Sequence, residues 1–215
     1  MAKVMSRIYD CSVDTQLLEG MRRARTAIKQ GKLVVLPTDT VYGIGADPRN
    51  AQAITRLLTA KSRTRENPPP VLVAGIGQAA ELSEALPEAA RRLMEAFWPG
   101  AMTIVVPARA TLGWDLGETN GTVALRMPDS APALALLRTI GPLAVTSANQ
   151  HGQPPASTVD EAIAQLGDAV SLYLDGGATG GAVPSTIVSV VAKPTILRHG
   201  MIPADDVWTV LGAAP

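Results

Sequence analysis

The chain has 215 residues, of which 47% are hydrophobic and 18% charged, so we expect a folded globular protein with a sizeable core. Its 19 lysines and arginines balance 19 aspartates and glutamates, which argues against a protein that binds nucleic acid through its overall charge. Aromatic residues make up only 3%, so a surface that stacks bases on aromatic side chains is not expected either.

Cysteine use and hydropathy limit the compartment and the kind of site. The single cysteine, Cys11, excludes an internal disulfide and a cluster of thiolate metal ligands. The opening stretch MAKVMSRIYD contains no apolar run of the kind found in signal peptides. The most apolar segment, residues 131–145, is interrupted by Arg138 and Pro142, which argues against a membrane span. We therefore expect a cytoplasmic protein with no membrane partner.

Apolar periodicity and capping residues predict helices and strands that alternate along the chain. Residues 14–30 have apolar side chains at helical spacing and stop at Gly31, Asn50 can cap a helix, and Thr158 and Glu161 have the spacing of a capping box. The predicted helices cover residues 14–30, 50–61, 87–98, 131–140 and 158–167, with a short one after Pro203. The predicted strands cover residues 33–36, 71–74, 102–106, 122–127, 143–146, 170–174, 186–191 and 195–198.

This alternation predicts an α/β protein built on one sheet. Several strands follow one another without a helix between them, so a mixed sheet fits better than a doubly wound parallel one. No stretch has the composition of a linker, and no internal repeat is present. We therefore expect a single domain over residues 1–215, with a twisted mixed open sheet flanked by helices.

The sequence lacks the common motifs of nucleotide binding and covalent hydrolysis. It contains neither G-x-x-x-x-G-K-[ST] nor a G-x-G-x-x-G that opens a helix after a strand, and no G-x-S-x-G surrounds Ser147 or Ser157. His151 and His199 are the only histidines, which are too few for a histidine metal site. A covalent nucleophile and a protein metal centre are therefore not expected.

What remains is a set of small hydroxyl and amide residues at strand ends, accompanied by cations on loops. The six segments are Thr38-Asp39-Thr40, Lys61-Ser62-Arg63-Thr64-Arg65, Arg126-Met127-Pro128, Thr146-Ser147-Ala148-Asn149, Pro184-Ser185-Thr186 and Arg198-His199-Gly200. Arginine and lysine are typical partners of phosphate and carboxylate groups, and hydroxyls and amides add donors for an amino acid or a ribose. Because ligands of open α/β sheets bind at strand ends, the segments together predict one site that holds reactants close and neutralises charge.

Each segment alone also has an ordinary structural interpretation. Lys61, Arg63 and Arg65 can complement the end of a helix on a solvated face, and Thr-Asp-Thr can form a turn. Ser-Ala-Asn can cap the next element, and DGGATGG can be a flexible loop. Arg126 and Arg198 can form surface ion pairs.

Seven short motifs give a more specific identification. PTDTVYGIG, KSR…NP, FWPGAMT, ALRMP, SAN, PSTIV and RHG occur in the order and at the spacing of the YrdC-like threonylcarbamoyl-AMP synthases, which the chain resembles over about residues 17–201. The resemblance implies a YrdC-like fold with a basic concave ligand-binding face. It implies a nucleotidyltransferase that makes threonylcarbamoyl-AMP and pyrophosphate from L-threonine, bicarbonate or CO2, and ATP. A downstream threonylcarbamoyl-transferase complex would then modify adenosine 37 of tRNA (t6A), and Mg2+ would arrive with ATP.

The resemblance also assigns roles to individual residues. Lys61 and Arg63 would act in catalysis by binding the triphosphate of ATP. The other ATP contacts would be Asn67, Thr122, Asn149, Ser157 and Arg198. The threonine contacts would be Thr40, Arg126, Ser147 and Ser185, with Arg126 binding the carboxylate. Asp39 is the acidic neighbour in the first motif, Gly43 and Gly45 would let the backbone pass close to the ligand, and no residue is assigned to a metal.

Three positions depart from the family pattern, and one rival function stays open. Pro69 and Leu72 stand where the family commonly has a leucine and a histidine near the threonine, and the Leu72 side chain cannot form a hydrogen bond. His151 occupies a position that is usually small. The rival is a non-catalytic module of the same fold that binds double-stranded RNA or tRNA, whose affinity would fall steeply with salt.

Overall fold

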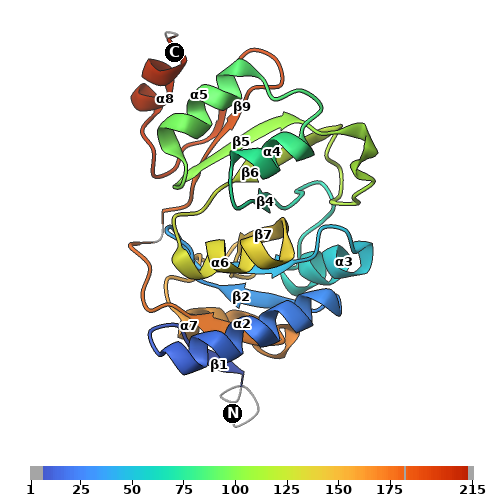
Figure 1. Ribbon diagram of the computed structural model, residues 1–215, viewed down its shortest axis with the longest axis vertical. Coiled ribbons are helices and arrows are strands. Elements are labelled where there is room, and N and C mark those ends of the chain that lie inside the picture. Colours follow the sequence, from blue (N-terminus) through green and yellow to red (C-terminus); the bar gives the residue numbers. More distant parts are fainter. Residues whose placement is uncertain (1–6, 182, 213–215) are drawn as a thin grey trace.

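Ten strands form one mixed sheet in the part of the chain that the computed structural model describes, residues 7–181 and 183–212 (Figure 1). The strands are β1 Ile8–Asp10, β2 Val34–Leu36, β3 Gly43–Ala46, β4 Val71–Leu72, β5 Met102–Pro107, β6 Thr122–Arg126, β7 Leu143–Ser147, β8 Leu172–Asp175, β9 Thr186–Ser189 and β10 Thr195–Arg198. Their order across the sheet is β1-β8-β2-β3-β7-β4-β6-β5-β9-β10. Parallel pairs such as β1 with β8 occur beside antiparallel pairs such as β2 with β3, which confirms the predicted mixed open sheet.

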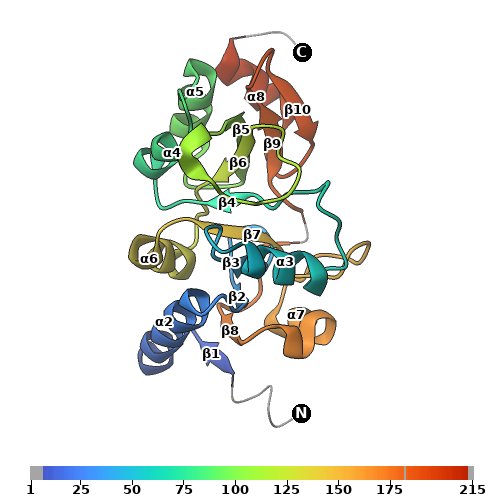
Figure 2. The same cartoon turned by 90° about the vertical axis from the view of Figure 1, so that its right-hand side faces the viewer.

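Helices cover both faces of the first half of this sheet, where the side chains of β2 alternate between two cores. The helices are α2 Asp14–Lys29, α3 Ala51–Ala60, α4 Ile76–Leu82, α5 Glu88–Phe97, α6 Ala131–Ile140, α7 Val159–Leu166 and α8 Ala204–Leu211, with 3-10 turns η1 Ala110–Leu112 and η2 Gly167–Ala169. Val34 and Leu36 pack with α2 and α6, whereas Val35 faces the cluster that includes α3 and α7. Figure 2 shows these helix pairs on opposite sides of β2. Among these described helices, none has the length and hydropathy needed to cross a bilayer.

A strand of only two residues, β4, joins the two halves of the sheet. The first half contains β1, β8, β2, β3 and β7, and the second half contains β6, β5, β9 and β10. Val71 of β4 pairs with Ala144 of β7 in the first half and with Leu125 of β6 in the second. Figures 1 and 2 show the two halves with their own helices below and above β4. The ends of strands from both halves therefore come together beside β4.

Local capping signals in the sequence are found in the structure, with one correction. The Asn50 side chain caps α3 by accepting from Ala53 N at 3.1 Å, and Thr158 Oγ1 caps α7 by accepting from Glu161 N at 3.3 Å. The predicted capping box is incomplete, because Glu161 Oε2 accepts from Ser157 N at 2.7 Å and not from the capping residue. The helix begins where the sequence predicted, but its glutamate binds the residue before the cap.

Gly43 and Gly45 lie on β3, a strand that the sequence did not predict. A Cβ atom at Gly43 would lie 2.5 Å from Val145, and one at Gly45 would lie 2.7 Å from Leu143. Both neighbours belong to β7, which pairs with β3. The glycines therefore make room for side chains of the adjacent strand. Gly43 also lines the cavity described below, so a close approach of the backbone to a ligand stays a prediction.

Candidate functional site

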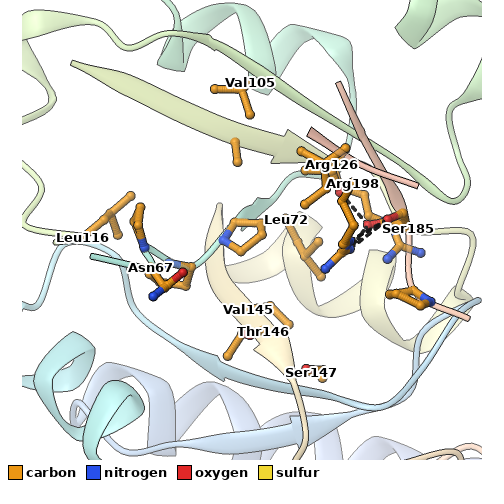
Figure 3. Close-up of a pocket in the computed structure, with 18 of the residues that line it drawn as sticks. Asn67, Leu72, Val105, Leu116, Arg126, Val145, Thr146, Ser147, Ser185 and Arg198 are labelled. Carbon is orange, nitrogen blue, oxygen red and sulfur yellow. Dashed lines mark hydrogen bonds between the residues drawn. The ribbon is translucent and has the colours of Figure 1, made fainter. Parts of the chain in front are cut away.

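A cavity of about 500 Å³ lies beside β4, where the two halves of the sheet meet (Figure 3). This volume is within the range of small-molecule sites. Eight of the residues that the sequence assigned to the site line it: Thr40, Arg63, Asn67, Thr122, Arg126, Ser147, Ser185 and Arg198. The other three, Lys61, Asn149 and Ser157, do not line it. Strand ends that are distant in sequence thus meet at one place, as the sequence predicted.

The Arg126 side chain is held by three different segments. Its Nε donates to Gly100 O at 3.0 Å, its Nη1 to Thr40 Oγ1 at 2.9 Å and its Nη2 to Asp39 Oδ1 at 2.6 Å. Burial lowers the pKa of Arg126, and the Asp39 carboxylate opposes that shift. Two of the five guanidinium N–H groups have no acceptor among the described residues, so they are free to bind a carboxylate. The ion pair is buried, not a surface pair.

A second cluster joins β5, β9 and β10 around Ser185. Arg198 donates to Ser185 O through Nε at 3.1 Å and Nη2 at 2.8 Å, and to Ser185 Oγ at 3.0 Å. Thr103 Oγ1 lies 2.8 Å from Ser185 Oγ and shares a hydrogen bond with it. Burial lowers the pKa of Arg198, and the positive charges of Arg126 and Arg63 lower it further. No ion pair within the described residues includes Arg198, so the surface ion-pair interpretation is wrong.

Arg63 supplies a third guanidinium group, from the segment that follows α3. Its Nη1 donates to Thr146 Oγ1 at 3.1 Å, whereas its buried Nε has no partner in the described part of the chain. Burial lowers the pKa of Arg63. Of these three guanidinium groups, only that of Arg126 has an ion-pair partner among the described residues, Asp39. The arginine end of the cavity therefore favours an anionic ligand. A wider basic concave face stays a prediction.

The Thr38-Asp39-Thr40 segment is a turn that also faces the cavity. Thr38 Oγ1 donates to Val41 O at 2.6 Å and accepts from Thr40 N at 3.2 Å. The turn interpretation is therefore correct. It does not compete with a role in the site, because the turn presents Thr40 Oγ1 to the guanidinium of Arg126.

The cavity differs in chemistry between its two ends. Figure 3 shows Asn67 and Leu116 on the opposite side of Leu72 from Arg198 and Ser185. The end with the arginines suits phosphate and carboxylate groups, whereas the end with an amide and apolar side chains suits a neutral, flat group such as a nucleoside. Both ends open into the same space, so two ligands can lie in contact.

The three assigned residues that do not line the cavity have their polar groups bound elsewhere. Lys61 is 1% exposed and donates to Ser147 O, Asn149 O and Asn149 Oδ1, so a solvated face is wrong for this residue. Burial, with a smaller effect from a neighbouring arginine, lowers the pKa of Lys61 to about 7. Ser157 Oγ donates to Glu161 Oε2 at 2.9 Å.

Three further residues line the cavity although the sequence assigned them no contact with a particular substrate: Thr103, Thr146 and Tyr42. The Tyr42 hydroxyl donates to Gly177 O at 2.7 Å and accepts from Gly176 N at 3.0 Å. It therefore fixes the start of the glycine-rich segment that leads to β9. Each of the three residues lies inside or beside a motif noted above, and this position could have indicated that it belongs to the site.

Comparison with known proteins gives matches over most of the chain. The model of the Sua5/YciO/YrdC family, described as telomere recombination, matches residues 26–200. A Mycobacterium leprae protein named for threonylcarbamoyl-AMP synthase activity is 46% identical over 212 residues, which are 98% of this chain and 96% of that protein. A Bacillus subtilis threonylcarbamoyl-AMP synthase is 37% identical over 199 residues, covering 88% of this chain and 56% of its own. The crystal structure of Pyrococcus abyssi Sua5 complexed with L-threonine has a TM-score of 0.86 at 34% identity, over 90% of this chain and 58% of that one.

Proposed function

The chain belongs to the Sua5/YciO/YrdC family, and we propose that it is a threonylcarbamoyl-AMP synthase. It joins L-threonine, bicarbonate or CO2, and ATP to give threonylcarbamoyl-AMP and pyrophosphate. The observation that carries this proposal is the meeting of three guanidinium groups with several hydroxyls in one cavity. A carboxylate and a triphosphate are the anions that such donors bind most strongly.

Threonine binds at the end of the cavity that contains Arg126. The two unused N–H groups of Arg126 bind its carboxylate in the forked geometry that arginine favours. The hydroxyls of Thr40, Ser147 and Ser185 surround the rest of the amino acid. Threonine has an amine and a hydroxyl of its own, so these hydroxyls can act as donors or acceptors towards it.

ATP occupies the remaining space, with its phosphates towards the cations. Arg63 and Arg198 bind the triphosphate, while Asn67 and Thr122 contact the nucleoside end. The described residues contain no group of three or more His, Cys, Asp or Glu side chains that could hold a metal ion. Arginines and hydroxyls suit phosphate and not a metal, so Mg2+ enters as part of the MgATP substrate.

The chemistry requires no covalent enzyme intermediate. The threonine amine attacks the carbon of CO2 or bicarbonate, a nitrogen–carbon bond forms, and a proton or a water molecule leaves. A carbamate oxygen then attacks the α-phosphorus, and the bond to the bridging oxygen breaks to release pyrophosphate. Holding the reactants in contact can supply about 7–11 kcal/mol of the barrier reduction, and the guanidinium groups stabilise the leaving charge.

The product is an activated mixed anhydride, so another enzyme must take it up before water does. A threonylcarbamoyl-transferase complex that modifies adenosine 37 of tRNA is the partner that fits the product, and the cytoplasm is where both would act. The rival function, an RNA-binding module, is less suited to this cavity. The arginines of the cavity are partly buried between the two halves of the sheet, where a nucleic acid backbone has little access.

The direct test is to incubate the protein with ATP, magnesium, L-threonine and bicarbonate and to measure pyrophosphate and the acyl-adenylate. Release of both, dependent on threonine, supports the proposal; a folded protein that makes neither contradicts it. Arg126→Ala should raise the threonine KM much more than the ATP KM, and Arg63→Ala should do the reverse. Equal effects of both variants on both substrates would contradict the assigned ends of the cavity.

A further inference from the structure

The ammonium group of Lys61 donates all its hydrogen bonds to one short segment of the chain. It is the C-terminal cap of α3, and its Nζ donates to Ser147 O, to Asn149 O and, at 3.1 Å, to Asn149 Oδ1. We call residues 147–149 the 147–149 loop. An ammonium group has three N–H donors, and all three are used here. None remains for a phosphate oxygen while the loop keeps this arrangement.

The acceptors around Lys61 carry no formal charge. No ion pair among the described residues includes Lys61, and the charged residue that affects it is Arg63, another cation. Burying an ammonium group without a carboxylate is unfavourable, because hydrogen bonds to neutral oxygens replace only part of the lost hydration. The arrangement is therefore a poor means of stabilising the fold, which points to a role in the site.

The rest of the loop is built to present its oxygens to this ammonium group. Asn149 Nδ2 donates to Gln150 O at 2.9 Å and to Gln153 O at 2.7 Å, which leaves Oδ1 directed at Lys61. His151 N donates to Lys61 O at 2.9 Å. The side chain and the backbone of Lys61 therefore hold the chain on both sides of Asn149.

The 147–149 loop and the residue before it carry two hydroxyls of the cavity wall. Ser147 lines the cavity beside the carbonyl that Lys61 binds, and Thr146 accepts from Arg63 Nη1 at 3.1 Å. A shift of the loop would move the Ser147 hydroxyl away from the threonine end. The position of Lys61 is thus coupled to the wall without any contact between its ammonium group and the cavity.

We propose that Lys61 is a positioning residue, which fixes the 147–149 loop and with it the threonine-binding wall, and that it does not bind the triphosphate. This role rests on the proposed function, because the wall is the one that binds threonine there. It replaces the triphosphate role that the sequence resemblance gave to Lys61. Arg63 and Arg198 line the cavity and keep that role.

Because the positioning role depends on the protonated form of Lys61, threonine binding should depend on pH. Burial first, and the charge of Arg63 second, lower the pKa of Lys61 to about 7. A neutral amine has two N–H donors and a lone pair, so one loop oxygen then faces a lone pair. Among the described residues, Arg63 is the charged group that acts on Lys61 through its charge, and His151 N donates to the backbone oxygen of Lys61 at 2.9 Å.

The test measures the binding of L-threonine alone and of pyrophosphate alone by calorimetry. Lys61→Met removes the ammonium group and keeps an unbranched side chain. We expect its threonine Kd to rise by about tenfold or more, and its pyrophosphate Kd to change by less than about threefold. Arg63→Ala should weaken pyrophosphate binding instead, and His151→Asn should change neither.

Two results would overturn the role: a wild-type threonine Kd in folded Lys61→Met, or a loss of pyrophosphate binding as large as in Arg63→Ala. Wild-type protein that does not bind threonine would contradict the proposed function itself. If circular dichroism shows that Lys61→Met is unfolded, the role is tested on the wild-type protein by measuring its threonine Kd against pH. Its threonine Kd should rise between about pH 6 and pH 8, on either side of the Lys61 pKa, and should do so in His151→Asn as well. A threonine Kd that does not change between these pH values would overturn the positioning role of Lys61.

Discussion

The guanidinium group of Arg126 donates to the carboxylate of Asp39 at 2.6 Å, so an ion pair joins the end of β6 in the second half of the sheet to the turn after β2 in the first. Both side chains are largely buried, at 8% and 16% exposure. Asp39 also accepts from Asp129 N at 3.0 Å. The carboxylate therefore fixes the arginine that we propose to bind threonine, and it links the two halves of the sheet across the cavity.

Asp39→Ala should destabilise the protein by about 3 kcal/mol, because it leaves the Arg126 charge buried without its counterion. Added L-threonine brings a carboxylate to the same guanidinium group, so it should raise the melting temperature of the variant more than that of the wild type. Thermal unfolding with and without L-threonine measures both effects. Asp129→Ala, which removes an exposed carboxylate nearby, is the matched control. If L-threonine raises the melting temperature of Asp39→Ala no more than that of the wild type, threonine and Asp39 do not bind the same guanidinium group.

Thr103→Val should weaken threonine binding while it keeps the fold. The change removes the hydroxyl that lies 2.8 Å from Ser185 Oγ and replaces it with a methyl group of similar size. Arg198 still binds Ser185, so the loss should be modest, about 1 kcal/mol or fivefold in Kd. Calorimetric titration with L-threonine measures it. Thr195→Val, on the exposed surface of β10, is the control, and equal Kd values in the two variants would show that Thr103 does not position Ser185.

Strong local signals allowed most of the fold to be predicted from the sequence. The apolar period of α2 and the Asn50 cap of α3 depend on neighbours within a few residues, and both are confirmed. β1 and α4 were missed. β1 has three residues and depends on pairing with β8, and α4 begins at Ile76 after Gly75, which has no side chain to cap it. β3 was missed because its two glycines are typical of a loop, and their close packing against β7 appears only in the structure.

The cavity could be predicted because its residues belong to motifs at strand ends, but their hydrogen-bond partners could not. The Thr103–Ser185 pair spans 82 residues of sequence, and the Tyr42–Gly177 pair spans 135. The burial of Lys61 could not be predicted for the same reason. A lysine at the end of a helix is usually solvated, and its burial follows from a loop that lies 86 residues further along the chain.

Tyr42→Phe should loosen the segment that leads from β8 to Ser185. The hydroxyl binds Gly177 O at 2.7 Å and Gly176 N at 3.0 Å, and its loss leaves both backbone groups without this partner. We expect a loss of about 1–3 kcal/mol in unfolding free energy and faster amide hydrogen exchange in residues 175–181. Tyr9→Phe is the control, since the hydroxyl of Tyr9 has no hydrogen bond among the described residues. Unchanged exchange in Tyr42→Phe would show that the segment is held by other contacts.

Lys61 should also make the stability of the protein depend on pH in an unusual direction. Its pKa falls from 10.5 to about 7 on folding, so between these values the unfolded chain binds a proton that the folded protein does not. The free energy of unfolding of the wild type, minus that of Lys61→Met, should therefore be constant below about pH 7 and rise above it, by up to about 1.4 kcal/mol per pH unit. Urea unfolding at a series of pH values up to about 9.5 measures this difference, and Lys32→Met, at an exposed lysine, is the control variant. A difference for Lys61 that stays level or falls across this window would mean that its ammonium group is not buried in solution.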